Sequence, residues 1–153
     1  MSIPSETAPA PRGQTEGVHP AATHLIVLPG GGYASHAAHE AEPIVAWLST
    51  QGLSASVFRY PLHVRHPEPL LALRAEIRRR REEGADRIGV IGFSAGGHLA
   101  GLAAHEVPHT VHVFAHGPHS LGLAEGAGDT ATCTRLAESW IAEQVRMPHP
   151  GTS

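Results

Sequence analysis

The sequence predicts an α/β fold: a three-layer sandwich around a small, mainly parallel β-sheet. Apolar runs of strand length alternate with amphipathic segments of helix length along the chain. Glycines and prolines separate the two kinds of segment. Right-handed crossovers between successive strands then give a sheet of about four strands in the spatial order 2-1-3-4.

The expected strands are short apolar runs bounded by turn residues. They are His24–Leu28, Ser54–Tyr60, Arg87–Phe93 and Thr110–Ala115. The first of them, HLIVL, is stopped by Pro29 and a row of glycines, as is typical of a buried parallel strand.

The expected helices carry their apolar residues at helical spacing. They are Glu40–Thr50, Pro67–Glu83, Ala95–His105 and Thr130–Val145. In the first helix Ile44, Trp47 and Leu48 fall on one face, and a glycine just beyond it provides a stop. Proline opens the second helix and Gly84 ends it.

Length and composition favour one globular domain without nucleic-acid or membrane partners. The chain has 153 residues, 41% hydrophobic and 16% charged, and its net charge of −3 gives no electrostatic reason to bind nucleic acid. It contains neither an apolar run that could span a bilayer nor a secretory signal, so we expect a cytoplasmic location. We expect flexible segments at 1–22 and 147–153 and a folded domain at 23–146.

The motif G-x-S-x-G occurs at Gly92-Phe93-Ser94-Ala95-Gly96. An apolar strand precedes it and a helix of small residues follows it, which is the context of a nucleophile elbow. In such a turn the serine hydroxyl projects at the carboxyl end of the sheet, and the N–H of the next residue points into the same space. Ser94 is therefore a candidate nucleophile.

A second glycine loop, Pro29-Gly30-Gly31-Gly32-Tyr33, ends the first strand. Glycine lets backbone N–H groups approach an oxyanion closely because no Cβ intervenes. A phosphate-binding loop is the rival interpretation, but the P-loop Lys-Ser/Thr pair and the G-x-G-x-x-G spacing are both absent. Two glycine loops at one sheet edge favour an oxyanion hole.

These motifs together resemble a known family. The runs are LPGGGYASHAAHEAEPIVAWL, FRYPLHVRHPEPLLALRAEIRR, DRIGVIGFSAGGHLAGLAA and VHVFAHGPHSLGLA. They are similar to α/β-hydrolase esterases of the acetylxylan-esterase-like and feruloyl-esterase-like group, relatives of the hormone-sensitive-lipase type. The resemblance implies that Ser94 is the nucleophile, His119 the base, and Gly31, Gly32 and Ala95 the oxyanion hole, with no cofactor.

The sequence departs from this family between the serine helix and the last strand. Glu106-Val107-Pro108 leads straight into Thr110–Ala115, so the family segment with two further strands and the triad acid has no counterpart. We therefore expect a truncated α/β-hydrolase. The deletion still leaves Ser94 and His119 at one edge of the sheet.

The acid of the triad has several candidates. Asp129 and Glu125 lie in the loop after His119, and Asp129 is also explained as the N-cap of the last helix. Glu40 and Glu42 belong to other segments at the same edge, and a second subunit could also supply a carboxylate. The sequence leaves this choice open.

The histidine-rich segments of the sequence do not predict a metal site. His36, His39 and Glu40 form H-x-x-H-E, which lacks the helical order of zinc proteases, and the family resemblance explains the run without a metal ion. His109, His112 and His116 are interleaved with valine and phenylalanine in and beside the expected strand Thr110–Ala115, so alternation would put them on one face. This strand would form a sheet edge, and unpaired edges recruit partners, so we expect a homodimer.

The predicted function is a serine carboxylesterase that acts on small, short-chain esters through an acyl-Ser94 intermediate. The missing segment removes chain that would form much of an acyl pocket and a lid, which favours small acyl groups. The alternative is a catalytically weak or inactive hydrolase-derived binding or interaction module. A serine that reacts with a fluorophosphonate would separate the two.

Overall fold

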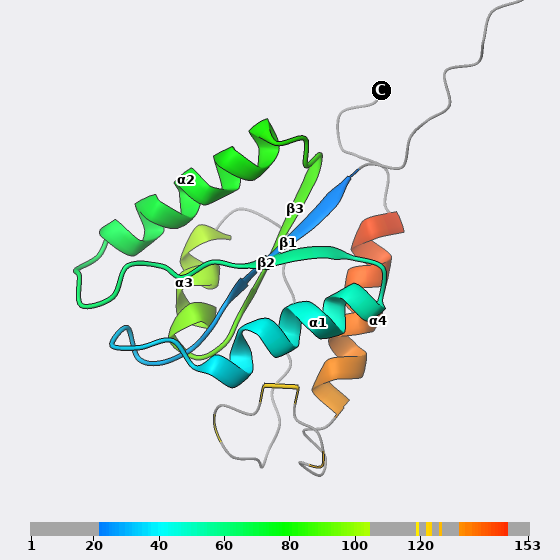
Figure 1. Ribbon diagram of the computed structural model, residues 1–153, viewed down its shortest axis with the longest axis horizontal. Helices are drawn as coiled ribbons and strands as arrows, with labels where there is room; N and C mark the ends of the chain where they lie inside the picture. Colours follow the sequence, from blue (N-terminus) through cyan, green and yellow to red (C-terminus); the bar gives the residue numbers. More distant parts are fainter. Residues whose placement is uncertain (1–21, 105–118, 120–121, 124–125, 127–131, 147–153) are drawn as a thin grey trace, which may run out of the picture.

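A parallel sheet of three strands in the order β2-β1-β3 lies at the centre of the described structure (Figure 1). The computed structural model describes residues 22–104, 119, 122–123, 126 and 132–146. The strands are β1 (Thr23–Leu28), β2 (Ser54–Val57) and β3 (Arg87–Gly92), and β1 pairs with both neighbours in parallel. This order confirms the expected arrangement of the first three strands, whereas the strand predicted at 110–115 lies outside the described residues.

Helices connect and flank these strands. They are the 3₁₀ turn η1 (Ala38–Glu40) and the α-helices α1 (Glu42–Thr50), α2 (Glu68–Glu82), α3 (Ala95–Ala103) and α4 (Thr132–Arg146). Each connection from one described strand to the next contains a helix, as parallel strands require. The expected α/β fold class is therefore confirmed.

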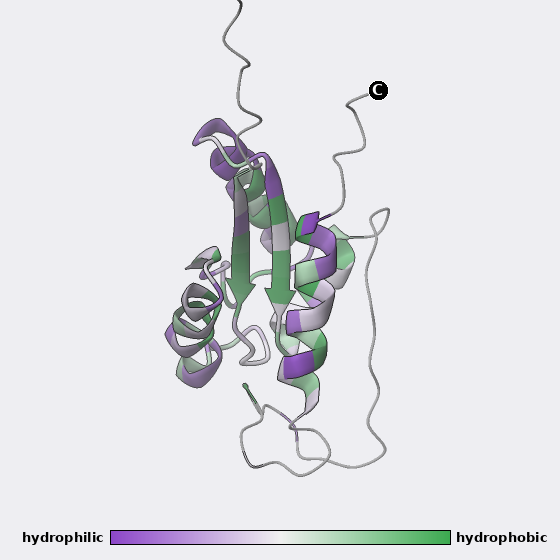
Figure 2. Ribbon diagram, turned by 90° about the vertical axis from the view of Figure 1, so that its right-hand side faces the viewer, coloured by the Kyte–Doolittle hydropathy of each residue, from purple (hydrophilic) through white to green (hydrophobic). Residues whose placement is uncertain are grey.

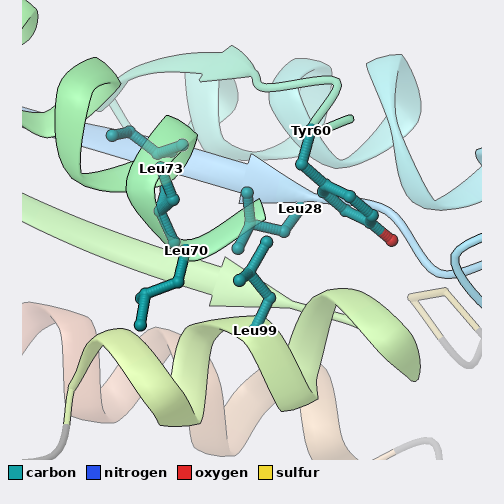
Figure 3. Close-up of a cluster of buried hydrophobic side chains, with 6 residues drawn as sticks. Leu28, Tyr60, Leu70, Leu73 and Leu99 are labelled. Carbon is teal, nitrogen blue, oxygen red and sulfur yellow. The ribbon is translucent and has the colours of Figure 1, made fainter. Parts of the chain in front are cut away.

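Two apolar layers on opposite faces of the sheet make the core. Side chains alternate along β1, so that Ile26 and Leu28 pack toward α2 and α3. Leu25 and Val27 pack on the other face, toward α1 and α4. The apolar strands therefore lie between two helical layers (Figure 2), and the three-layer sandwich is confirmed. Figure 3 shows the first layer, in which leucines from β1, α2 and α3 meet Tyr60.

Several elements are shorter than the sequence predicts, and the structure explains the difference at β2 and α1. Strand β2 ends at Val57 instead of Tyr60, because the chain turns away after the Phe58 N–H bonds the Val27 carbonyl, 2.9 Å. Tyr60 is then free to turn its ring into the core. Helix α1 begins at Glu42 instead of Glu40, because Glu40 closes the separate turn η1 and Ala41 leaves the helical region (φ −112°, ψ −106°).

Two of the predictions concern a membrane and a second copy of the chain. No helix within the described ranges is long and apolar enough to cross a membrane. The homodimer was inferred from the edge strand at 110–115, which lies outside the described residues, so it stays a prediction.

Candidate active site

Ser94 occupies a sharp turn between β3 and α3. Its φ of 49° lies in the left-handed region that non-glycine side chains rarely adopt. Both flanking glycines are required by close packing. A Cβ on Gly92 would stand 2.3 Å from the Gly96 carbonyl oxygen, and a Cβ on Gly96 would stand 2.2 Å from the Leu28 carbonyl oxygen. The strand-turn-helix geometry is that of a nucleophile elbow.

His119 lies against this serine. Its Nε2 is 2.8 Å from the Ser94 Oγ, which is a hydrogen-bond distance. When the imidazole is neutral and Nε2 carries no proton, the serine hydroxyl donates to it, which is the arrangement that activates a serine. The structure therefore brings together the two residues for which the sequence predicts chemistry.

The glycine loop after β1 reaches the same edge of the sheet. Gly31 and Gly32 have φ values of 125° and 64°, conformations that favour glycine. The Gly31 carbonyl accepts from the N–H groups of Ala34 and Ser35, 3.1 Å each, which closes the loop tightly. A Cβ built on Gly30 would lie 2.9 Å from the Ser94 Cβ, so the loop directly adjoins the nucleophile elbow.

Ala95, the third predicted member of the oxyanion hole, is the first residue of α3. The first N–H groups of a helix have no acceptor within the helix and lie at its positive end. This location suits the binding of a developing negative charge next to Ser94.

Tyr33 is a site residue that sequence reasoning missed. Its hydroxyl is 2.9 Å from the His98 Nδ1 on α3, and its carbonyl accepts from the His63 N–H, 2.9 Å. Burial raises the pKa of the Tyr33 phenol, so its proton stays available for the contact with His98. Tyr33 thus ties the glycine loop to the helix that follows Ser94. Its position directly after the glycines is the signal that could have identified it.

The carboxylates at this edge have very different surroundings. Asp129 and Glu125, the predicted acids, lie outside the described residues. Glu40 is fully buried, and its Oε2 accepts from the Gly30 N–H at 2.8 Å. Glu42 is exposed and pairs with Arg59 at 2.7 Å, a hydrogen bond that lowers the pKa of Glu42. The sequence had indicated the edge at which Glu40 lies but not its contact with Gly30.

The side chains of the H-x-x-H-E run, His36, His39 and Glu40, make separate contacts. The His36 ring packs edge-to-face on Tyr60 with ring centroids 4.8 Å apart, and burial lowers the pKa of His36. The His39 Nε2 lies 3.6 Å from the Glu40 Oε1. Among the residues that the structure describes, no cluster of three or more His, Cys, Asp or Glu side chains could hold a metal ion.

Sheet order, elbow and glycine loop define the class as an α/β-hydrolase fold. A similar solved structure is the acetyl ester-xyloside bifunctional hydrolase from Caldicellulosiruptor lactoaceticus, with a TM-score of 0.70 and 25% identity. The match covers 80% of this chain and 83% of that chain. The predicted resemblance to α/β-hydrolase esterases is confirmed by this similarity.

Two further comparisons cover less of the chain. MGS-M1, an alpha/beta hydrolase from a Medee basin deep-sea metagenome library, is 38% identical over 52% of this chain and 36% of that chain, with a TM-score of 0.45. Endo-1,4-beta-xylanase B of Butyrivibrio fibrisolvens is 30% identical over 93 residues, or 53% of this chain. The chain spans only 15% of that curated relative's length. No family model matches the chain.

Proposed function

We propose that the chain is a serine carboxylesterase in which Ser94 is the nucleophile and His119 the general base. The observation that carries this proposal is the 2.8 Å contact between the Ser94 Oγ and the His119 Nε2. The strained turn at Ser94 and the adjoining glycine loop support it, because acyl transfer requires a nucleophile and an oxyanion site at one place.

Acylation begins when the Ser94 Oγ attacks the carbonyl carbon of the ester. The hydroxyl proton moves to the His119 Nε2, and the carbonyl oxygen gains the negative charge. In this proposal the N–H groups of Gly31, Gly32 and Ala95 stabilise that charge. When the bond to the alcohol breaks, the departing oxygen takes the proton from His119.

Deacylation repeats the same steps with water as the nucleophile. His119 takes a proton from the water as its oxygen attacks the acyl carbon. When the bond to the Ser94 Oγ breaks, His119 returns the proton to the serine. The products are a carboxylic acid and the free enzyme.

The proposed substrates are small, short-chain esters, and acetyl esters are the first choice. The similar protein from Caldicellulosiruptor lactoaceticus is a hydrolase of acetyl esters and xylosides, and its match extends over most of both chains. The proposal predicts that acetates react faster than long-chain esters, and the reverse order would contradict it.

The test is hydrolysis of p-nitrophenyl acetate by the wild type beside Ser94→Ala and His119→Ala. We expect Ser94→Ala to fall to the background rate and His119→Ala to lose at least about 10²-fold. Ser49→Ala, on the exposed surface of α1, is the matched control and is expected to keep full activity. A fluorophosphonate is expected to label the wild type but not Ser94→Ala. Equal rates in all four proteins would favour a non-catalytic binding module.

The same assay separates the two proposed acids. Asp129→Asn keeps a side chain that can cap a helix but removes the carboxylate charge. Glu125→Gln makes the matched change at the other candidate. The variant that loses on the order of 10⁴-fold in kcat identifies the acid, as expected when the orienting carboxylate of a triad is lost. Full activity of both variants would exclude both residues.

A further inference from the structure

The peptide between Pro29 and Gly30 is held at both of its polar atoms by buried side chains. The Gly30 N–H donates to the Glu40 Oε2 at 2.8 Å. The Pro29 carbonyl accepts from the Tyr60 hydroxyl at 2.7 Å. Glu40 is 0% exposed and Tyr60 is 1% exposed, so water does not compete for either bond. We call Glu40 and Tyr60 the peptide clamp.

The clamped peptide follows the end of β1 closely and leads into the glycine loop. A peptide unit is planar, so bonds at both its N–H and its C=O fix its rotation about the chain. Gly31 and Gly32 follow with positive φ values, and glycine offers no side chain of its own to fix that geometry. The orientation of their N–H groups therefore depends on the peptide that precedes them.

The clamp lies directly beside the nucleophile. A Cβ built on Gly30 would stand 2.6 Å from the Glu40 Oε2 and 2.9 Å from the Ser94 Cβ. Gly30 is thus packed between the carboxylate and the serine. A shift of this peptide would move the glycine loop relative to Ser94.

Tyr60 is itself rigidly placed. Its ring makes edge-to-face contacts with Tyr33 and His36, with centroids 5.5 and 4.8 Å away. Figure 3 shows the ring at the end of the leucine cluster with its hydroxyl pointing away from the leucines. Burial, with the nearby Tyr33 and Glu40, raises the pKa of Tyr60 to about 12, so the phenol keeps the proton that it donates.

Glu40 is difficult to explain as a stabilising residue. A buried carboxyl group costs desolvation energy unless its oxygens are well paired. Its Oε1 has no hydrogen bond to any described residue, and the His39 Nε2 is 3.6 Å away. Among the described residues, the hydrogen bond that Glu40 makes is the one to the Gly30 N–H, which holds a loop of the candidate site.

We propose that the peptide clamp positions the oxyanion hole: Glu40 and Tyr60 fix the Pro29–Gly30 peptide so that the N–H groups of Gly31 and Gly32 face the reacting carbonyl oxygen. This inference rests on the proposed esterase function and adds two positioning residues to it. The clamp touches the loop and not the substrate. Its loss should therefore weaken transition-state binding while leaving ground-state binding unchanged.

The experiment compares Glu40→Ala, Glu40→Gln and Tyr60→Phe with the wild type on p-nitrophenyl acetate. Glu40→Ala and Tyr60→Phe are expected to lower kcat by about 10-fold to 10²-fold with KM unchanged, as for a small misplacement of a catalytic group. Glu40→Gln keeps an oxygen acceptor for the Gly30 N–H and should lose less. Glu82→Ala removes an exposed carboxylate at the end of α2, outside the candidate site, and is expected to keep full activity.

Hydrogen exchange of the Gly30 amide, measured by NMR, tests the clamp without relying on activity. We expect fast exchange in Glu40→Ala and slow exchange in the wild type and Glu40→Gln. Unchanged kcat in Glu40→Ala and Tyr60→Phe, in an active wild type, would overturn the inference alone. A wild type no faster than Ser94→Ala would overturn the proposed function and the catalytic role of the clamp with it. In that case slow Gly30 exchange would still show that the contact itself exists. If Glu40→Ala fails to fold, Tyr60→Phe and Glu40→Gln carry the comparison.

Discussion

Ser94 adopts a strained conformation that its neighbours make necessary. A non-glycine residue in a sparsely populated backbone region costs of order 1–3 kcal/mol. The cost persists here because the chain must turn from β3 into α3 while the helix packs against the end of β1. Gly96 makes that approach possible, since a Cβ on it would meet the Leu28 carbonyl oxygen at 2.2 Å.

Gly96→Ala is therefore expected to destabilise the protein. The added methyl group meets backbone, which cannot rotate away, so we expect a loss of about 2 kcal/mol or more in the free energy of unfolding. Gly101→Ala in the same helix is the matched control, because a Cβ there meets nothing within 4 Å. It is expected to raise stability by up to about 1 kcal/mol. Urea unfolding of both variants checks this, and equal effects at the two positions would contradict the packing argument.

Local patterns in the sequence predict the Ser94 turn but not the environment of Glu40. The turn depends on glycines at fixed places next to the serine, and steric rules act on neighbours in the chain. The bond between Glu40 and Gly30 depends on how η1, a turn of 3 residues, packs against the glycine loop that follows β1. Such a short turn has no hydrophobic period that would reveal which side chain points inward.

At the scale of elements, α4 completes the second apolar layer of the sandwich. Its Ile141 packs into the cluster of Leu25, Val27, Ile44 and Leu48. The Trp47 Nε1 on α1 donates to the Glu138 Oε1 on α4 at 3.1 Å. Arg87 at the start of β3 donates to the carbonyls of Gln144 and Val145, 2.9 Å each, and so satisfies the end of the helix.

Ile141→Ala should weaken the attachment of α4. Ile141 is 6% exposed and lines a cavity between α1 and α4, so truncation removes apolar contacts and enlarges that cavity. We expect a loss of about 2–4 kcal/mol in the free energy of unfolding. Val145→Ala, at a site 38% exposed on the same helix, should cost less than about 0.5 kcal/mol. Thermal and urea unfolding measure both, and similar losses would show that α4 is not held through Ile141.

Hydrophobic periodicity predicts most elements, and tertiary contacts decide their ends. The segment expected at 130–145 forms a helix over Thr132–Arg146, because its apolar side chains repeat at helical spacing. The segment SASVFRY has strand composition throughout, but only its first residues pair with β1. Its Tyr60 bonds the Pro29 carbonyl instead, and no pattern within the segment shows that partner.

At the scale of the whole molecule, two histidines link stability to pH: the buried His24 on β1 and the half-buried His36 in the loop before η1. His24 on β1 bridges the hydroxyls of Ser54 and Ser56 on β2, with contacts of 2.8 and 2.9 Å. Burial, and then the positive charge of Arg80, lowers the pKa of His24. Burial likewise lowers the pKa of His36 beside Tyr60. The folded protein thus favours the neutral form of both rings.

This difference predicts that the protein loses stability as the pH falls below about 6.5, the ordinary histidine pKa. The unfolded chain binds protons at both histidines before the folded protein does, so the free energy of unfolding decreases with falling pH over that range. Glu76 has a lowered pKa because it hydrogen-bonds Arg79 and Arg80, so a further loss begins below its ordinary value of 4.5.

Urea unfolding of the wild type and of a His24→Gln, His36→Gln double variant, at pH values of about 7.5 and 5.5, measures the histidine contribution. Glutamine can still donate to and accept from the serine hydroxyls, but it does not titrate. We therefore expect the double variant to lose less stability than the wild type between these two pH values, whatever its stability at the higher one. The same loss in both proteins would place the pH sensitivity elsewhere. Since Glu76 titrates below this range, its carboxylate contributes little to the difference, and the comparison isolates the contribution of His24 and His36.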